Sequence, residues 1–183
     1  MDRAKFFDNI RDSLFGGKLS KAQVAGLEAI LEAWRVLFFK DERWLAYILA
    51  TAYHETNRTM RAIEEYGKGR GKEYGKPDKE TGKTYFGRGL VQLTWKRNYC
   101  AASEFLYQDI DLASHPERAL ELPVAAQIIV CGMLDGTFAG HKLEDFFSEA
   151  TEDWRGARRI VNGLDCADKI AGYGKKFYAA LRA

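Results

Sequence analysis

The residue best suited to chemistry in this sequence is Glu55, which follows a strongly apolar run. That run extends from Trp44 to Tyr53 and leads directly into His54, Glu55 and Thr56. Burial of a carboxylate beside apolar side chains disfavours its charged form and raises its pKa. A general acid that works near neutral pH needs such a raised pKa. The position of Glu55 therefore predicts a general acid at the end of a buried helix.

A second carboxylate is expected in the pair Glu64 and Glu65. Hydrolysis of a glycosidic bond uses two carboxyl groups, one to protonate the leaving oxygen and one to activate water or attack the sugar. If the helix continued past Glu55, a residue nine or ten positions later would lie about 14 to 15 Å further along its axis. We therefore expect the helix to end near Thr56 and Asn57 and the chain to double back. Asn57 tolerates left-handed backbone geometry, which suits it to this stop.

A third segment, Tyr85 to Trp95, combines glycines and aromatic residues with polar side chains. Gln92 offers an amide for sugar hydroxyls, and Thr94 offers a hydroxyl that could hold a water molecule. Taken alone, both would be ordinary strand or turn residues. Their aromatic setting favours the lining of a sugar-binding cleft.

Together these segments resemble the pattern of glycoside hydrolase family 19, which includes chitinases and phage endolysins. The matches occur in order over roughly residues 40 to 180: His54-Glu55-Thr56, then Met60 and Ile63, then Tyr85 to Thr94 with Asn98-Tyr99, then Arg159 to Gly163 and Ala171-Gly172-Tyr173. The stretch from Met1 to Phe39 is more similar to phage and prophage endolysins than to plant chitinases. The resemblance implies a lysozyme-like α+β fold, an inverting mechanism and no cofactor.

The resemblance also implies roles for individual residues. An aliphatic residue stands two positions before the second acid in the family, as Ile63 does here, so Glu65 is expected to be catalytic and Glu64 remains its substitute. The acid that is not catalytic would be a surface residue paired with Lys68 or Arg70. Thr94 would help to hold the attacking water. The residues implied to contact substrate or water are His54, Gln92, Asn98, Tyr99 and Asn162, with His54 in a supporting hydrogen-bonding role. Arg97 departs from the family, since plant chitinases carry a tyrosine there.

The elements that position these residues are predicted to be mainly helices. Apolar residues from Phe6 to Phe15 recur at helical spacing until Gly16-Gly17 stops the helix. Ser20 and Gln23 form a capping box for a second helix whose apolar face runs to Phe38, and Asp41 can cap a third. Further helices are expected at 96–107, 123–135, 143–148, 152–161 and 166–182. Residues 66–89 are rich in glycine and basic residues, and they predict a long loop or a small irregular β-hairpin.

The length of 183 residues fits a single domain over residues 1–183, with the helical stretch 1–39 packed on it. We therefore expect a mainly α protein with a loop-rich or small β-hairpin insert beside the active-site cleft. A net charge of +2 is too weak to argue for nucleic acid. Three cysteines without Cys-x-x-Cys spacing predict buried free thiols and no zinc site; the three are Cys100, Cys131 and Cys166.

The N-terminal residues carry charge where a signal peptide needs an apolar core, and no long apolar run occurs. We expect a monomer without stable membrane association, held in the host cytoplasm until release to the cell wall. The resemblance to endolysins implies a separate, holin-like pore for that release.

Three functions are open from the sequence. The first is a peptidoglycan-degrading endolysin that hydrolyses the β-1,4 bond between N-acetylmuramic acid and N-acetylglucosamine. The second is a chitinase acting on β-1,4-linked N-acetylglucosamine. The third is a non-catalytic cell-wall binding module that uses the basic loop and its aromatic residues. The acids at positions 55 and 65 argue against the third, and the N-terminal stretch favours the first.

Overall fold

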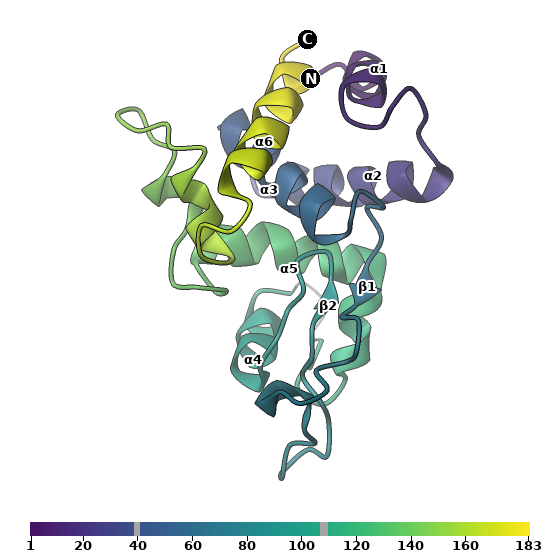
Figure 1. Cartoon of the computed structure of the whole chain (residues 1–183), viewed down its shortest axis with the longest axis vertical. Coiled ribbons are helices and arrows are strands. Elements are labelled where there is room, and N and C mark those ends of the chain that lie inside the picture. The colour runs from purple at the N-terminus through teal and green to yellow at the C-terminus, as the bar shows by residue number, and fades with distance from the viewer. Residues whose placement is uncertain (39–40, 107–109) are drawn as a thin grey trace.

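The computed structural model describes residues 1–38, 41–106 and 110–183. Figure 1 shows a mainly helical molecule with a short two-stranded sheet and long loops at one end. The helices are α1 (Arg3–Ser13), α2 (Lys21–Arg35), α3 (Glu42–Glu55), α4 (Lys96–Glu104), α5 (Leu122–Asp135) and α6 (Ala167–Leu181). The strands are β1 (Ile63–Glu64) and β2 (Arg88–Gly89), and the 3₁₀ turns are η1 (Glu73–Gly75), η2 (Pro116–Leu120), η3 (Leu143–Asp145) and η4 (Gly156–Ile160). The predicted fold class, mainly α with a small β element, is confirmed.

Helix α3 lies in the middle of the core, with α6 packed against it (Figure 1). Every residue from Leu45 to Tyr53 is buried. A helix that is apolar on all sides has to be covered on all sides. The Tyr53 ring shows how this is done, since it makes edge contacts with Phe15 of the N-terminal stretch and with Tyr173 and Phe177 of α6.

The predicted helix starts at α2 and α3 are confirmed. The Ser20 side chain accepts from the Gln23 amide, and the Gln23 side chain accepts from the Ser20 amide. The Asp41 carboxylate accepts from the Arg43 amide and so caps α3. The predicted reach of the second helix to Phe38 is wrong. Helix α2 ends at Arg35, and Phe38 has a positive φ of 57° and is 88% exposed.

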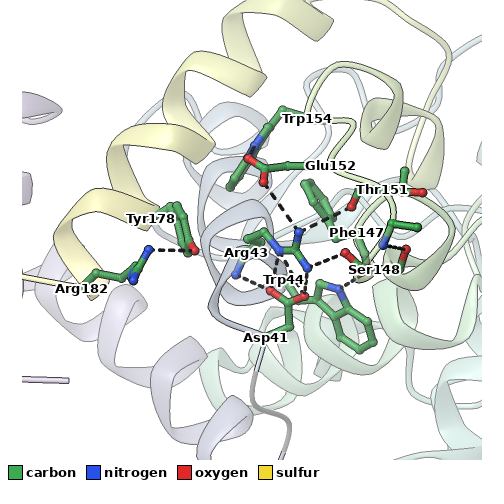
Figure 2. A network of polar contacts seen from close by, with 11 residues as sticks. Asp41, Arg43, Trp44, Phe147, Ser148, Thr151, Glu152, Trp154, Tyr178 and Arg182 are labelled. Atoms are coloured by element: carbon green, nitrogen blue, oxygen red, sulfur yellow. Dashed lines mark hydrogen bonds and ion pairs between the residues drawn. The ribbon is translucent and has the colours of Figure 1, made fainter.

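Arg43 fixes the start of α3 to a distant loop. Figure 2 shows its guanidinium between Asp41 and the segment from Ser148 to Glu152. Its Nη2 atom donates to Asp41 at 2.6 Å and to the Ser148 carbonyl at 2.9 Å. Trp44 adds a bond from its indole to the Phe147 carbonyl at 3.0 Å. These contacts hold the loop that leads towards η4 against the central helix.

The chain reverses sharply after α3, as the sequence predicted. The Thr56 hydroxyl donates to the Ala52 carbonyl at 2.7 Å and accepts from the Met60 amide at 3.0 Å. Asn57, Arg58 and Met60 all have positive φ. The reversal leads into β1, which pairs antiparallel with β2 in the register Ile63 to Gly89 and Glu64 to Arg88.

Residues 66–87 form the long connection between β1 and β2, consistent with the predicted loop or irregular hairpin. Two of the expected later helices are absent. Residues 143–148 and 152–161 contain only the short 3₁₀ turns η3 and η4, because the chain between them folds into an isolated bridge between Phe147 and Glu152. The end of the helix expected at 96–107 falls partly outside the described residues, and α4 itself stops at Glu104.

The cysteines are free among the described residues, but the predicted burial is wrong for two of them. Cys100 and Cys166 are exposed, and Cys131 is partly buried. Cys100 lies on the outward side of a short helix, and Cys166 precedes α6 with a positive φ of 56°. Burial raises the pKa of the Cys131 thiol to about 11. Within the described part of the chain, the helices are too short or too polar to cross a membrane.

The close approach of α2 to the reversal gives a test of this packing. A Cβ atom at Gly26 would lie 1.9 Å from the Met60 carbonyl oxygen, so Gly26→Ala must push the reversal away. We expect a loss of about 1–3 kcal/mol in the free energy of unfolding, measured by urea denaturation. Gly172→Ala in α6 is the matched control, because nothing lies within 4 Å of that position. It should stabilise the protein by about 0.5–1 kcal/mol. Equal effects of the two changes would contradict the packing described.

Candidate active site

Glu55 lies at the C-terminal end of α3 and forms an ion pair with Arg158. The Arg158 Nη1 atom is 2.7 Å from Glu55 Oε1. The Arg158 side chain is 4% exposed and that of Glu55 is 16% exposed. Arg158 is held in turn by its Nε, which donates to the Asp165 carbonyl at 3.1 Å. The apolar setting predicted for Glu55 is therefore wrong, because its nearest polar partner is a buried guanidinium.

The ion pair leaves part of the Glu55 carboxyl group available. Arg158 contacts only Oε1, and among the described residues no hydrogen bond is made to Oε2. A carboxyl group fixed at one oxygen can present the other to a ligand in a defined direction. The arrangement suits either a proton donor or an acceptor, so geometry alone does not decide the role.

Glu65 is held through both carboxylate oxygens. Tyr74 donates its hydroxyl to Oε1 at 3.0 Å, and the Gly87 amide donates to Oε2 at 3.0 Å. The Glu65 amide donates to the Gly87 carbonyl at 2.7 Å, which continues the pairing of the two strands. The pKa of the Tyr74 phenol is raised, first by burial and then by this hydrogen bond to Glu65. Glu65 is therefore a positioned carboxylate that accepts from two neutral donors.

Glu64 has a different setting from its neighbour. It is exposed and forms an ion pair of 2.7 Å with Lys68, four residues further along the chain. This is the surface pairing expected of whichever acid is not catalytic. The two settings favour Glu65 over Glu64 as a site residue, in the order that the sequence predicted.

The buried side chains of Arg88 and Tyr99 support the glycine-rich segment around Phe86 from the interior of the protein. The Arg88 Nη1 atom donates to the Thr84 carbonyl at 3.0 Å and to the Tyr99 hydroxyl at 3.1 Å, and its guanidinium lies 3.6 Å from the centre of the Phe86 ring. Tyr99 donates to the Phe86 carbonyl at 2.7 Å and has no exposed surface. The structure thus places Tyr99, predicted to contact substrate, inside the protein as a support for the loop. Asn98 is also buried, at 8% exposure.

Gln92 and Thr94 lie on the same loop with different environments. Gln92 has a positive φ of 54° and donates from Nε2 to the Ile63 carbonyl at 3.3 Å. This bond ties the loop to β1, two residues before Glu65. Thr94 is half-buried, and no side-chain hydrogen bond of its hydroxyl is found within the described residues. Its hydroxyl is therefore available to a water molecule or a sugar.

Asn162 and His54 both lie on the Glu55 side of the site. Asn162 is exposed, and its amide donates to the Arg158 carbonyl at 3.1 Å. The predicted Asn-Gly segment therefore continues directly from the residue that pairs with Glu55. His54 is half-buried, and burial lowers its pKa despite the nearby charge of Glu55. A neutral imidazole in this position can accept or donate one hydrogen bond.

The basic loop over residues 66–83 is folded back on itself. A Cβ atom at Gly75 would lie 2.0 Å from the Gly69 carbonyl oxygen, so two stretches of backbone cross there. Asp78 anchors the loop to Lys96 at 2.9 Å. Hydrogen bonds from the Thr81 amide and then from Lys96 lower the pKa of Asp78 to about 2. Trp95 packs edge-on against Tyr74 with ring centres 5.3 Å apart. The loop therefore acts as a scaffold for Tyr74, the donor to Glu65.

Two residues of this site were not found from the sequence. Arg158 immediately precedes the segment from Arg159 to Gly163, so its place beside that motif was the available signal. Tyr74 carried no such signal, because it lies in a glycine-rich loop without periodicity. Arg158 is 103 positions from Glu55 and Tyr74 is 9 positions from Glu65, and the fold brings each pair into contact.

Comparison with known proteins supports the fold and a chitinase-like sequence. No family model matches the chain. An endochitinase of Arabidopsis thaliana is 30% identical over 128 residues, which make up 66% of this chain but only 43% of that protein. The chain thus spans less than half the length of that relative.

Two solved structures of chitinase C resemble the whole chain. A glutamate-to-glutamine mutant of chitinase C aligns with a TM-score of 0.60 and 20% identity, covering 100% of this chain and 93% of the other. Chitinase C from Streptomyces griseus HUT6037 aligns with a TM-score of 0.58 and 18% identity, covering 100% and 76%. The fold implied by the sequence resemblance is confirmed.

The Tyr74 contact gives a test of how Glu65 is positioned. Tyr74→Phe removes the hydroxyl but keeps the ring that packs on Trp95. If Glu65 takes part in catalysis, we expect kcat to fall about tenfold with little change in KM, since a hydrogen bond to a charged group contributes about 1.5–3 kcal/mol. Tyr66→Phe is the matched control, because Tyr66 is fully exposed and makes no hydrogen bond through its side chain among the described residues. A rise in KM at constant kcat would instead make Tyr74 a residue for substrate binding.

Proposed function

We propose that this chain is a family 19 glycoside hydrolase that cleaves β-1,4 bonds in an amino-sugar polymer, with Glu55 as general acid and Glu65 as general base. The observation that carries the proposal is the presence of two positioned carboxyl groups on separate segments, one at the end of α3 and one after β1. The similarity to chitinases in fold and sequence supports the same class of reaction. The third possibility, a non-catalytic wall-binding module, does not account for two acids held by dedicated partners.

The proposed reaction is a single displacement with inversion. Glu65 accepts a proton from a water molecule, the water oxygen attacks the anomeric carbon, and Glu55 gives its proton to the departing glycosidic oxygen. Thr94 lies on the loop whose Gly87 amide binds Glu65, so its hydroxyl is proposed to help hold the attacking water. Inversion needs carboxyl groups roughly 6.5–9.5 Å apart, which separate chain segments can provide.

Peptidoglycan is the substrate we favour, with an endolysin as the biological role. The similarity of residues 1–39 to phage and prophage endolysins supports it, and Arg97 in place of the plant tyrosine argues against a plant-type chitin subsite. The cations of the basic loop also suit an anionic polymer, since Arg70, Lys72, Lys79 and Lys83 form no ion pair among the described residues. This role would require the separate pore-forming partner mentioned above. Chitinase activity is the alternative, and the names of the relatives favour it.

Substitution of the acids tests the assigned roles. Glu55→Gln keeps an oxygen that can accept from Arg158 but cannot supply the proton, and Glu65→Gln cannot accept one. Each should lower the rate of clearing of purified peptidoglycan, measured by turbidity, by about 10²–10⁴-fold, with unchanged circular dichroism. Glu64→Gln is the matched control and should retain most of the activity. If Glu64→Gln were the more severe change, the role of base would pass to Glu64; a folded and active Glu55→Gln protein would refute the proposed acid.

The products test the mechanism and the bond that is cut. Inversion at a β-linked sugar gives a fresh product of α configuration, which NMR can detect before mutarotation. Cleavage after N-acetylmuramic acid should give fragments that end in reduced muramic acid when treated with borohydride and analysed by mass. An initial β-anomer would exclude inversion, and reduced glucosamine ends would move the cut to the other bond. Turnover of chitin oligomers without any effect on peptidoglycan would establish the chitinase alternative.

A further inference from the structure

A small polar cavity adjoins the helix end that carries Glu55. It has a volume of about 90 Å³ and lies between the C-terminal end of α3 and the start of α6. Its lining consists of Tyr53, His54, Asn57, Arg58, Lys169 and Tyr173. A cavity needs only about 10–15 Å³ of such volume to hold one water molecule, so this one has room for a small polar group such as a carboxylate. The proposed reaction does not use this cavity.

The lining carries positive charge without a balancing acid. Arg58 and Lys169 each lie at the cavity, and among the described residues neither makes an ion pair or a side-chain hydrogen bond. The acids whose charges act on His54 are Glu55 and Asp165, and Asp168, next to Lys169 in the sequence, pairs with Arg155. Glu55 is already paired with Arg158, and none of these three acids belongs to the lining. An anion in the cavity would therefore meet two cations that have no other partner there.

The backbone that carries Arg58 is fixed on both sides. The Arg58 amide donates to the Tyr53 carbonyl at 2.7 Å, and its carbonyl accepts from the Gln23 side chain at 3.0 Å. Its φ of 68° lies in the left-handed region, so the strained reversal after α3 is what brings this side chain to the cavity. Asn57, His54 and Tyr173 add neutral groups that can donate hydrogen bonds to an anion.

We propose that this cavity binds the carboxylate of an acidic amino sugar in the substrate, and so selects N-acetylmuramic acid over N-acetylglucosamine. The inference rests on the proposed function, because it assigns a specificity site for the substrate of that reaction. His54 lines the cavity and is the residue before Glu55 at the end of α3, so the site is proposed at the same helix end as the general acid. The carboxylate is either that of the lactyl group or one on the stem peptide attached to it. Chitin carries neither.

Direct binding tests the inference without any need for turnover. Three probes would be titrated into the protein by NMR: chitobiose, the disaccharide of N-acetylglucosamine and N-acetylmuramic acid with a free lactyl carboxylate, and the same disaccharide with a dipeptide on the lactyl group. We expect an acidic disaccharide to bind the wild-type protein about tenfold more tightly than chitobiose, as one charge-assisted hydrogen bond would provide. The probe that shows the preference identifies the lactyl or the peptide carboxylate as the ligand.

Two variants and one control make the test specific. Lys169→Gln removes one cation, and Arg58→Asn removes the other while keeping a residue that tolerates the left-handed backbone. Both should abolish the preference for the acidic probe. Lys175→Gln, an exposed lysine further along α6, should keep it.

A wild-type protein without a preference, or a preference that survives Lys169→Gln and Arg58→Asn, would overturn the inference. Failure of the proposed function would show separately, as the absence of glycosidic cleavage in the turbidity and product assays. A protein that cleaves peptidoglycan but binds the three probes equally would retain the function and lose this site.

Discussion

The backbone reversal between Glu55 and Glu65 is the constraint on which the rest of the site depends. A continuous helix would carry the second acid far along its axis, so the chain has to turn back within a few residues. Three residues of the turn, Asn57, Arg58 and Met60, adopt positive φ, which costs roughly 1–2 kcal/mol for a residue with a side chain. Complete burial of Met60 and its contact with Gly26 offset this cost. Strain of this kind is often found at functional sites, where the surrounding packing holds it in place.

The reversal joins two parts of the molecule that hold the acids by different means. Glu55 belongs to the helical core and is held by Arg158, which comes from η4 on the way to α6. Glu65 belongs to the loop-rich part and is held by Tyr74 and by the backbone of Gly87. Within the loop-rich part, the short sheet joins β1 to β2, and the bond from Gln92 to Ile63 joins the following loop to β1. The loop of residues 66–87 thus has a structural reason for its length, since it carries the donor to Glu65.

The features that could be predicted from the sequence are those fixed by neighbouring residues. The capping box of Ser20 and Gln23, the cap at Asp41 and the stop after Glu55 depend on contacts within a few positions, and all three are present. Patterns of apolar residues failed where the chain makes irregular turns, as at Phe38 and in residues 143–161. The partners of the two acids could not be predicted for a different reason. Arg158 is 103 positions from Glu55, and nothing local to either residue indicates that the fold brings them together.

The ion pair at Glu55 changes how the proposed acid would work. From the sequence, apolar surroundings were expected to keep the carboxyl group protonated before reaction. In the structure a buried guanidinium lies 2.7 Å from one of its oxygens. In the proposed mechanism, Glu55 gains negative charge as its proton passes to the departing sugar oxygen. The guanidinium of Arg158, fixed beside the Glu55 carboxyl group, stabilises this charge as it develops. Such preorganised electrostatic stabilisation lowers the barrier to reaction. Arg158 would therefore stabilise the charged carboxylate both in the ion pair seen here and as it forms in the reaction, and the rate would depend on the position of Arg158 as well as on its charge.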